Sequence, residues 1–218
     1  MPDRYTEPEP ARSALLTIDV QRDFAEPGAP AEIAGTADCV PAMRTVLTAY
    51  RQAGLPIVHV VRLYLADGSN ADICRREMLE NGEAFVSPGS DGAEILDSLK
   101  RGPDIRLDAA ALLASKLQPA GNNEWILCKP RWDAFHATTL EPHLRECGVT
   151  TVVVVGCNFP NCPRSTVYSA SMRDFRAVLI RDAVSGVYER GLAELVNIGV
   201  ATPSSVEWAE KISRLSPA

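Results

Sequence analysis

The chain has 218 residues, of which 46% are hydrophobic and 23% are charged, a composition ordinary for a globular protein. Its formal net charge of −6 argues against a surface for nucleic acid or anionic lipid, because both attract an excess of lysine and arginine. No apolar run approaches the roughly 18 residues of a membrane span, and residues 1–10 lack the basic-then-apolar order of a signal peptide. We therefore expect a cytoplasmic protein whose residues 1–12 form a flexible, disordered or draped tail.

Strands and helices alternate along most of the chain. Apolar runs rich in β-branched residues predict strands at residues 14–20, 56–63, 125–129, 151–155 and 177–184, with an edge strand within 199–205. Helical periodicity and terminal signals predict helices at residues 40–53, 72–81, 93–99, 108–117, 138–147, 163–173, 189–198 and 205–215. This alternation is typical of βαβ units, so we expect one α/β domain, residues 13–218, with a parallel sheet covered on both faces. Residues 64–123 are loosely patterned, and we interpret them as an excursion within that domain.

The segment from Thr150 to Thr166, T-T-V-V-V-V-G-C-N-F-P-N-C-P-R-S-T, combines a buried strand, a short turn and the start of a helix. Pro163 is expected at the first helical position, which places Cys162 at the N-cap. The positive end of the helix dipole would favour the thiolate there, and N–H groups of the turn could face a negatively charged oxygen. Cys162 is therefore either a nucleophile or a small, buried, apolar residue.

The cysteines and histidines do not indicate a disulfide framework or a metal site. The six cysteines are spread through a large chain without an export signal and contain no C-x-x-C pair, so we expect reduced thiols. The three histidines show neither H-x-x-x-H spacing nor a grouping with cysteines that is typical of zinc. We therefore expect no metal and no cofactor, and we interpret His59, inside an apolar strand, as a hydrogen-bonded core residue.

Two further reactive side chains stand at the ends of predicted strands, where sites form in parallel α/β sheets. Asp19 lies near the end of the first strand, and Lys129 ends the strand at residues 125–129. If both converge on Cys162, the ammonium would favour the thiolate and the carboxylate could carry the thiol proton to a leaving group. Each residue also has an ordinary interpretation, with Asp19 as a turn cap, Lys129 as a solvated cation and Cys162 as core.

Three motifs in this order resemble those of the isochorismatase-like cysteine hydrolases, a superfamily that includes nicotinamidases and N-carbamoylsarcosine amidohydrolases. They are D-V-Q-R-D-F (Asp19 to Phe24), K-P-R-W-D-A-F (Lys129 to Phe135) and G-C-N-F-P-N-C (Gly156 to Cys162), and the strand–helix pattern agrees over residues 12–200. The resemblance implies a three-layer, doubly wound, Rossmann-like sheet and a homo-oligomer, either dimer or tetramer. It also implies hydrolysis of a C–N bond in a small amide, ureide or carbamoyl compound.

The same resemblance assigns roles to individual residues. Asp19, Lys129 and Cys162 would form a catalytic triad in which Cys162 attacks a carbonyl carbon and forms a thioester. A cis peptide bond would join Cys157 to Asn158, and the backbone N–H groups of Asn158 and Cys162 would form the oxyanion hole.

Several positions depart from the family pattern and bear on the substrate. Phe159 and Pro160 replace the Thr and the Asn or Asp that usually follow the cis pair, and Pro163 stands where an aliphatic residue is common. No Asp-x-His metal site follows the first helix, so a nicotinamide anchored by a metal is not favoured. Isochorismate hydrolysis is not favoured either, because the family members that perform it lack the cysteine.

The pocket around the triad is expected to be lined by Phe24, Arg62, Tyr64, Trp132, Phe135 and Phe159. Phe24 and Trp132 are the better candidates because they flank triad residues, whereas core packing also explains the other aromatic residues. Arg62 is either an anchor for a substrate carboxylate or part of a surface ion pair. Arg131 is interpreted as structural and paired with an acidic neighbour.

Other functions are also compatible with the sequence. Cys157 and Cys162 could form a redox-active disulfide, although their spacing is not C-x-x-C and this function leaves Asp19 and Lys129 without a role. A non-catalytic, partner-binding homologue is compatible with the unusual N-F-P-N turn. A dinucleotide site is not supported, because G-x-G-x-x-G is absent after the central strand.

Overall fold

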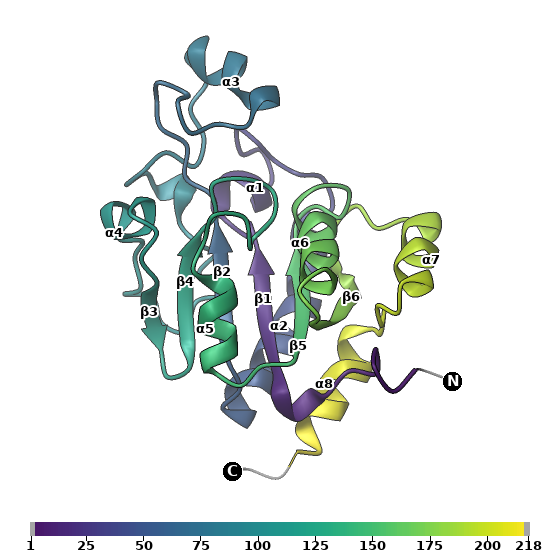
Figure 1. Ribbon diagram of the computed structural model, residues 1–218. Helices are drawn as coiled ribbons and strands as arrows, with labels where there is room; N and C mark the ends of the chain where they lie inside the picture. Colours follow the sequence, from purple (N-terminus) through teal and green to yellow (C-terminus); the bar gives the residue numbers. More distant parts are fainter. Residues whose placement is uncertain (1–2, 216–218) are drawn as a thin grey trace.

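A six-stranded, mostly parallel sheet forms the centre of the computed structural model, which describes residues 3–215 (Figure 1). The strands are β1 (Ser13–Ile18), β2 (Ile57–Val61), β3 (Gln118–Gly121), β4 (Glu124–Cys128), β5 (Thr151–Gly156) and β6 (Arg176–Val184). The helices are α1 (Arg22–Ala25), α2 (Thr36–Ala53), α3 (Ile73–Glu80), α4 (Ala109–Leu113), α5 (Leu140–Glu146), α6 (Cys162–Ser171), α7 (Glu189–Asn197) and α8 (Ser205–Ser213), with short 3-10 helices at Pro10–Arg12 and Asp91–Ala93. None of these helices is both long and apolar enough to cross a membrane. The predicted α/β fold is confirmed.

The order of the strands identifies the edge of the sheet where a site is expected. It is β3-β4-β2-β1-β5-β6, with β3 antiparallel to β4 and the other neighbours parallel. From β1 the chain builds outward through β2 to β4, and then returns to add β5 and β6 on the other side of β1. The order therefore reverses between β1 and β5, and ligands of doubly wound sheets bind beyond the carboxyl ends of the strands at such a switch point.

Helices cover both faces of the sheet, with α5 and α6 in front and α2 behind in Figure 1. Val154 of β5 belongs to the same core as Val167 of α6, whereas the adjacent Val153 belongs to the core that contains Leu47 of α2. Successive side chains of a strand point to opposite faces, so a strand between two helical layers must be apolar at every position. This requirement explains the unbroken valine run of β5.

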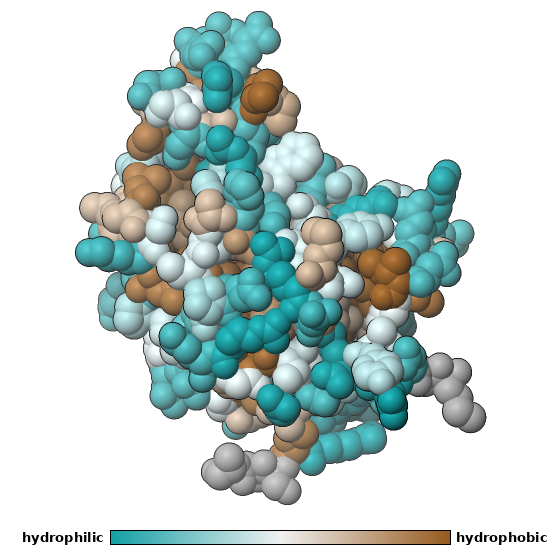
Figure 2. Space-filling view, in the orientation of Figure 1, coloured by the Kyte–Doolittle hydropathy of each residue, from teal (hydrophilic) through white to brown (hydrophobic). Residues whose placement is uncertain are grey.

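The loosely patterned residues 64–123 leave the sheet between β2 and β4, and α3 lies at the far end of this excursion, beyond the carboxyl ends of the strands (Figure 1). On the face shown in Figure 2, the surface around α3 is mainly hydrophilic. The helix predicted at residues 93–99 is wrong, because Ile95 forms an antiparallel bridge with Gln21 and the Leu96 N–H donates to the Val20 carbonyl. These two contacts attach the excursion to the segment that follows β1.

Other differences from the predicted elements occur at the edges of the sheet. The helix predicted at residues 108–117 is only α4, and its last residues lead into β3, which was not predicted because Pro119 interrupts its pattern. The edge strand predicted within residues 199–205 is reduced to a bridge between Ala201 and Val178. Helix α2 begins at Thr36, earlier than predicted, because its first turn carries exposed residues without apolar periodicity.

Glycine is required where β5 ends. Gly156 has φ +125°, and a Cβ at this position would lie 2.2 Å from the carbonyl oxygen of Ile18, which ends β1. That same oxygen accepts a hydrogen bond from the Cys157 N–H at 2.9 Å. The close approach therefore fixes the start of the turn after β5 against the end of β1.

The segment before β1 lies against the amino-terminal end of β5, away from this turn. The Glu9 N–H donates to Thr151 Oγ1 at 2.9 Å, and the Glu9 carboxylate pairs with Arg176 at 3.2 Å. Residues 9–12 are thus attached to the sheet by polar contacts.

Candidate active site

Three strand ends bring Asp19, Lys129 and Cys162 together. Asp19 directly follows β1, Lys129 directly follows β4, and Cys162 begins α6 after the turn that follows β5. Asp19 has φ +54°, and both of its backbone groups are bonded: its N–H donates to the Val60 carbonyl at 2.9 Å, and its carbonyl accepts from the Cys157 thiol at 3.0 Å. These bonds hold the chain as it turns out of the strand and direct the carboxylate.

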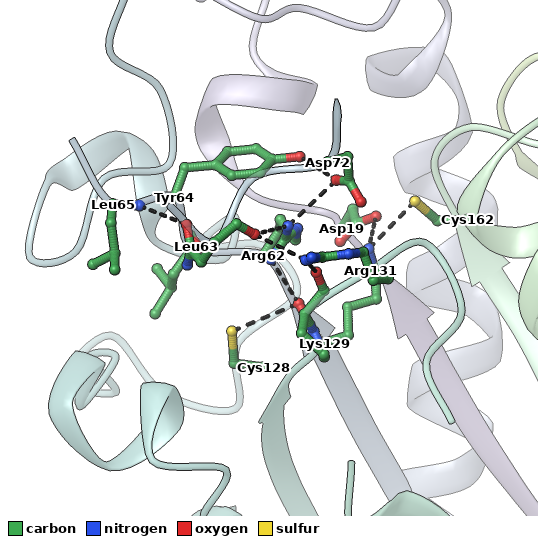
Figure 3. Close-up of polar contacts among 12 residues, drawn as sticks. Asp19, Arg62, Leu63, Tyr64, Leu65, Asp72, Cys128, Lys129, Arg131 and Cys162 are labelled. Atoms are coloured by element: carbon green, nitrogen blue, oxygen red, sulfur yellow. Dashed lines mark hydrogen bonds and ion pairs between the residues drawn. The ribbon is translucent and has the colours of Figure 1, made fainter. Parts of the chain in front are cut away.

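Lys129 joins the other two side chains (Figure 3). Its Nζ donates to Asp19 Oδ2 at 2.9 Å and to Cys162 Sγ at 3.3 Å. Asp19 and Lys129 are only 4% and 1% exposed, so water does not screen their interaction strongly. The second carboxylate oxygen, Asp19 Oδ1, is buried and has no hydrogen-bond partner within residues 3–215. This oxygen is therefore free to accept a proton.

The surroundings of Cys162 keep its thiol protonated at rest. Burial and the neighbouring Asp19 carboxylate raise the pKa of Cys162 to about 12, although Lys129 opposes both effects. This corrects the expectation that the helix terminus would favour the thiolate, because desolvation and a like charge outweigh the dipole. For Lys129, burial acts to lower the pKa, but the charge of Asp19 and the hydrogen bond to its carboxylate act in the other direction, and the pKa lies above its ordinary value. The ammonium therefore stays charged.

The turn between β5 and α6 presents two unused backbone donors. Its Cys157–Asn158 peptide bond is cis, at the position that the family resemblance implies. The N–H groups of Asn158 and Cys162 donate no hydrogen bond within the described part of the chain, whereas the N–H of Phe159 between them is bound to the Ser185 carbonyl at 2.7 Å. Asn158 and Cys162 also line the same pocket, and unused N–H donors are what an oxyanion needs for stabilisation.

Helix α6 begins one residue earlier than the sequence predicts. Asn161 occupies the N-cap, Cys162 is the first helical residue and Pro163 is the second. The prediction was wrong because proline is tolerated throughout the first turn, where the backbone N–H groups have no intrahelical acceptor. The Cys162 N–H is consequently one of the N–H groups of the first helical turn, which have no acceptor within the helix.

A pocket of about 300 Å³ opens onto these groups. Phe24, Arg62, Tyr64 and Trp132 line it, as predicted from the sequence. Phe135 and Phe159 do not line it, which corrects their assignment. Both are buried in the core on the α6 side of the sheet, where Phe135 packs against the Phe175 ring and Phe159 against the Tyr188 ring.

Arg62 is neither a free anchor for substrate nor part of a surface ion pair. Its side chain is 2% exposed and donates to the carbonyls of Lys129 and Asn70, at 3.0 and 2.9 Å, and to the Asp72 carboxylate at 3.3 Å. The Tyr64 hydroxyl donates to the same Asp72 oxygen at 3.0 Å (Figure 3). These bonds attach the excursion that carries α3 to the backbone of Lys129.

Two other predicted residues lie outside the pocket. His59 is buried with its ring nitrogens 2.8 Å from Thr17 Oγ1 and Glu124 Oε1, which confirms a hydrogen-bonded core residue. Arg131 donates to the Asn70 carbonyl at 3.1 Å instead of an acidic side chain, which corrects its expected partner. Within residues 3–215, no group of three or more His, Cys, Asp or Glu side chains is arranged to hold a metal ion.

Comparison with known proteins shows which family has this arrangement. The Isochorismatase domain model matches residues 13–207, a range that includes the sheet and all three converging side chains. The chain belongs to the isochorismatase family. A protein of Arabidopsis thaliana named "Probable inactive nicotinamidase" is 31% identical over 207 residues, covering 92% of this chain and 96% of the relative. The ureidoacrylate amidohydrolase RutB of Methylobacterium radiotolerans is 26% identical over 209 residues, covering 87% of this chain and 74% of the relative.

A solved structure agrees with the family assignment. The isochorismatase family protein of Desulfovibrio vulgaris is 31% identical and superposes with a TM-score of 0.78, covering 93% of this chain and 99% of that one. In this isochorismatase-family chain, the pocket also has lining residues that were not predicted from the sequence: Ile33, Cys74, Arg75 and Asn161. Asn161 could have been found because it precedes Cys162. Cys74 and Arg75 could not, because α3 carries no motif and only the fold brings it to the pocket.

Proposed function

We propose that this member of the isochorismatase family is a cysteine hydrolase that cleaves a C–N bond, other than a peptide bond, in a small amide, ureide or carbamoyl compound. One observation carries the proposal: a buried ammonium, a thiol and a carboxylate with an unused oxygen meet beside one pocket at the switch point of the sheet. The pocket volume is at the lower end of the range of roughly 300–1,000 Å³ for ligand sites, which favours a small substrate. The amidohydrolase name of the RutB relative supports the same class of bond.

In the first half of the reaction, the Asp19 carboxylate takes the thiol proton and the Cys162 sulfur attacks the carbonyl carbon of the substrate. Protonation of Asp19 removes the negative charge that raises the pKa of Cys162, while Lys129 stays positive, so the thiolate forms beside a cation. The oxyanion of the tetrahedral intermediate accepts hydrogen bonds from the N–H groups of Asn158 and Cys162. Asp19 then protonates the leaving nitrogen, the C–N bond breaks, and the acyl group remains on Cys162 as a thioester.

In the second half, water hydrolyses the thioester. Asp19 is again a carboxylate and removes a proton from the water molecule as its oxygen attacks the thioester carbonyl. The new tetrahedral intermediate expels the Cys162 thiolate, which recovers a proton from Asp19, and the acid product leaves. Lys129 remains protonated through both halves because its pKa is raised.

Substitution of Cys162 by alanine tests this mechanism. Wild-type protein is expected to release ammonia or an amine from members of a panel of small amides, ureides and carbamoyl compounds, and rapid acid quenching should show the acyl group on the Cys162 peptide by mass. Cys162→Ala should fold and lose turnover by about 10³-fold or more, because the covalent step has no nucleophile. The control is Cys147→Ala, since Cys147 is exposed and precedes the opposite end of β5. Turnover near the wild-type rate in Cys162→Ala would remove Cys162 from the mechanism.

A second candidate function is a non-catalytic protein that binds a small molecule in the same pocket. The observation that favours it is the name "Probable inactive nicotinamidase" of the relative from Arabidopsis thaliana. Wild-type protein that binds members of the panel, but neither releases a nitrogen product nor forms a thioester, would support this candidate over the hydrolase.

A further inference from the structure

Four charged side chains line the pocket, and the charges of three of them are balanced by ion pairs with other residues of the protein. Lys129 and Asp19 form an ion pair at 2.9 Å. Arg62 is paired with Asp72 at 3.3 Å. Arg75 of α3 is the fourth, and its charge is not balanced by a carboxylate within residues 3–215.

The contacts of Arg75 are with neutral groups. Its Nη1 lies 3.9 Å from the Met78 sulfur, and its guanidinium carbon lies 5.8 Å from the centroid of the Phe85 ring. The side chain is partly buried, so it has lost part of its hydration without gaining an anionic partner among the described residues. A planar guanidinium presents parallel N–H donors that match the two oxygens of a carboxylate. Arg75 can thus donate hydrogen bonds to an anionic group that enters the pocket.

We propose that Arg75 forms an anion subsite, and that the substrate is a short amide or ureide with a carboxylate at the end remote from the scissile C–N bond. The inference rests on the proposed function and deepens it. Arg75 and Cys162 line one pocket of about 300 Å³, so a single small molecule can contact both. Phe24 and Trp132 line the same pocket and provide apolar surface for the short chain that joins the amide to the carboxylate.

Matched pairs of amides test the subsite, each pair differing in whether the remote end is a carboxylate or an uncharged carboxamide. Succinamate and succinamide, together with the corresponding pairs that are one and two methylene groups longer, are assayed for ammonia release by wild type, Arg75→Gln and Arg76→Gln. Arg76 is the control because it lies on the same helix and carries the same charge but is exposed and does not line the pocket. Binding of the same compounds to the Cys162→Ala protein is measured by calorimetry, with and without Arg75→Gln. Circular dichroism verifies that each variant is folded.

The carboxylate member of at least one pair is expected to be preferred by kcat/KM, and in binding, by about tenfold to a hundredfold, as for a hydrogen bond between two charged groups. Arg75→Gln should abolish this preference mainly through KM, Arg76→Gln should retain it, and Arg75→Lys should keep part of it as a point charge without the planar fork. Absence of a preference in every pair, or a preference that survives Arg75→Gln, would overturn the subsite even if the amides are hydrolysed. If neither these amides nor the ureides and carbamoyl compounds of the panel are hydrolysed, the proposed function fails, and binding to the Cys162→Ala protein decides the subsite by the same criteria.

Discussion

Replacement of Asp19 by asparagine should make the Cys162 thiol more reactive toward an alkylating agent and, at the same time, stop hydrolysis. In the wild-type protein, burial and then the Asp19 carboxylate raise the pKa of Cys162 to about 12. Asparagine preserves the shape of the side chain and tolerates positive φ, which is +54° at this position. It carries no charge, however, and cannot accept the thiol proton.

The size of the effect follows from the geometry around Lys129. An Asp19 carboxylate oxygen and the Cys162 sulfur lie 2.9 and 3.3 Å from Lys129 Nζ, so they are within about 6 Å of each other. Two like unit charges at this separation repel by about 3 kcal/mol at an effective dielectric constant of ~20. Because each ~1.4 kcal/mol is a factor of ten, the asparagine variant should hold about a hundredfold more thiolate near neutral pH.

Alkylation by iodoacetamide, followed against pH by peptide mass mapping, measures the reactivity of each cysteine separately. At about pH 8, near the pKa of an ordinary thiol, wild-type Cys162 should react more slowly than the exposed Cys74. Asp19→Asn should accelerate alkylation of Cys162 by about a hundredfold while hydrolysis falls by about 10²–10⁴-fold. Lys129→Met should slow alkylation, because it removes the cation that opposes the raised pKa. Rapid reaction of wild-type Cys162 below this pH, or an unchanged rate in a folded Asp19→Asn protein, would refute the electrostatic reasoning.

Two further predictions concern stability. Gly156→Ala should lower the free energy of unfolding, measured in urea, by roughly 3 kcal/mol or more, because its Cβ would lie 2.2 Å from the carbonyl oxygen that ends β1. The control is Gly102→Ala, which should have little effect because no atom lies within 4 Å of its Cβ. Equal urea midpoints for the two variants would contradict this account. Burial acts to raise the pKa of Glu124, but hydrogen bonds from His59 and Arg51 outweigh it and lower the pKa from 4.5 to about 2. The ionised carboxylate therefore adds stability that is complete above about pH 4.5 and is lost as the pH falls toward about 2, by about 3 kcal/mol. Glu124→Gln should reduce this loss of unfolding free energy at low pH, as measured by unfolding at a series of pH values. An unchanged pH dependence would show that other groups cause the loss.

Local patterns were sufficient to predict much of the fold and of the candidate site. The valine run of β5 identifies a strand buried on both faces, because each face must be apolar between two helical layers. Asp19, Lys129 and Cys162 were found because each follows a predicted strand, and parallel strands end at the same edge of a sheet. Trp132 was placed in the pocket because it lies close to Lys129 in the chain.

Predictions failed where side chains far apart in the sequence decide the outcome. Phe159 directly follows the cis peptide bond, yet it is buried against Tyr188, because its backbone is bonded to Ser185 and directs the ring away from the pocket side. Arg62 belongs to a strand end, as expected for a site residue, but its partners Asn70 and Asp72 are supplied by a loop that has no periodic pattern.

The sequence by itself determined the alternating elements, the edge of the sheet where chemistry is expected, and the identities of the thiol, carboxylate and ammonium that meet there, because these depend on local periodicity and on strand ends. Only the tertiary structure decided the protonation of Cys162, since its pKa depends on burial and on a carboxylate that lies 143 residues earlier in the chain. The tertiary structure also decided which cation of the pocket is not paired with a carboxylate within residues 3–215. Arg75 reaches the pocket because the excursion folds back over the strand ends, whereas Lys129 and Arg62 are paired there with Asp19 and Asp72.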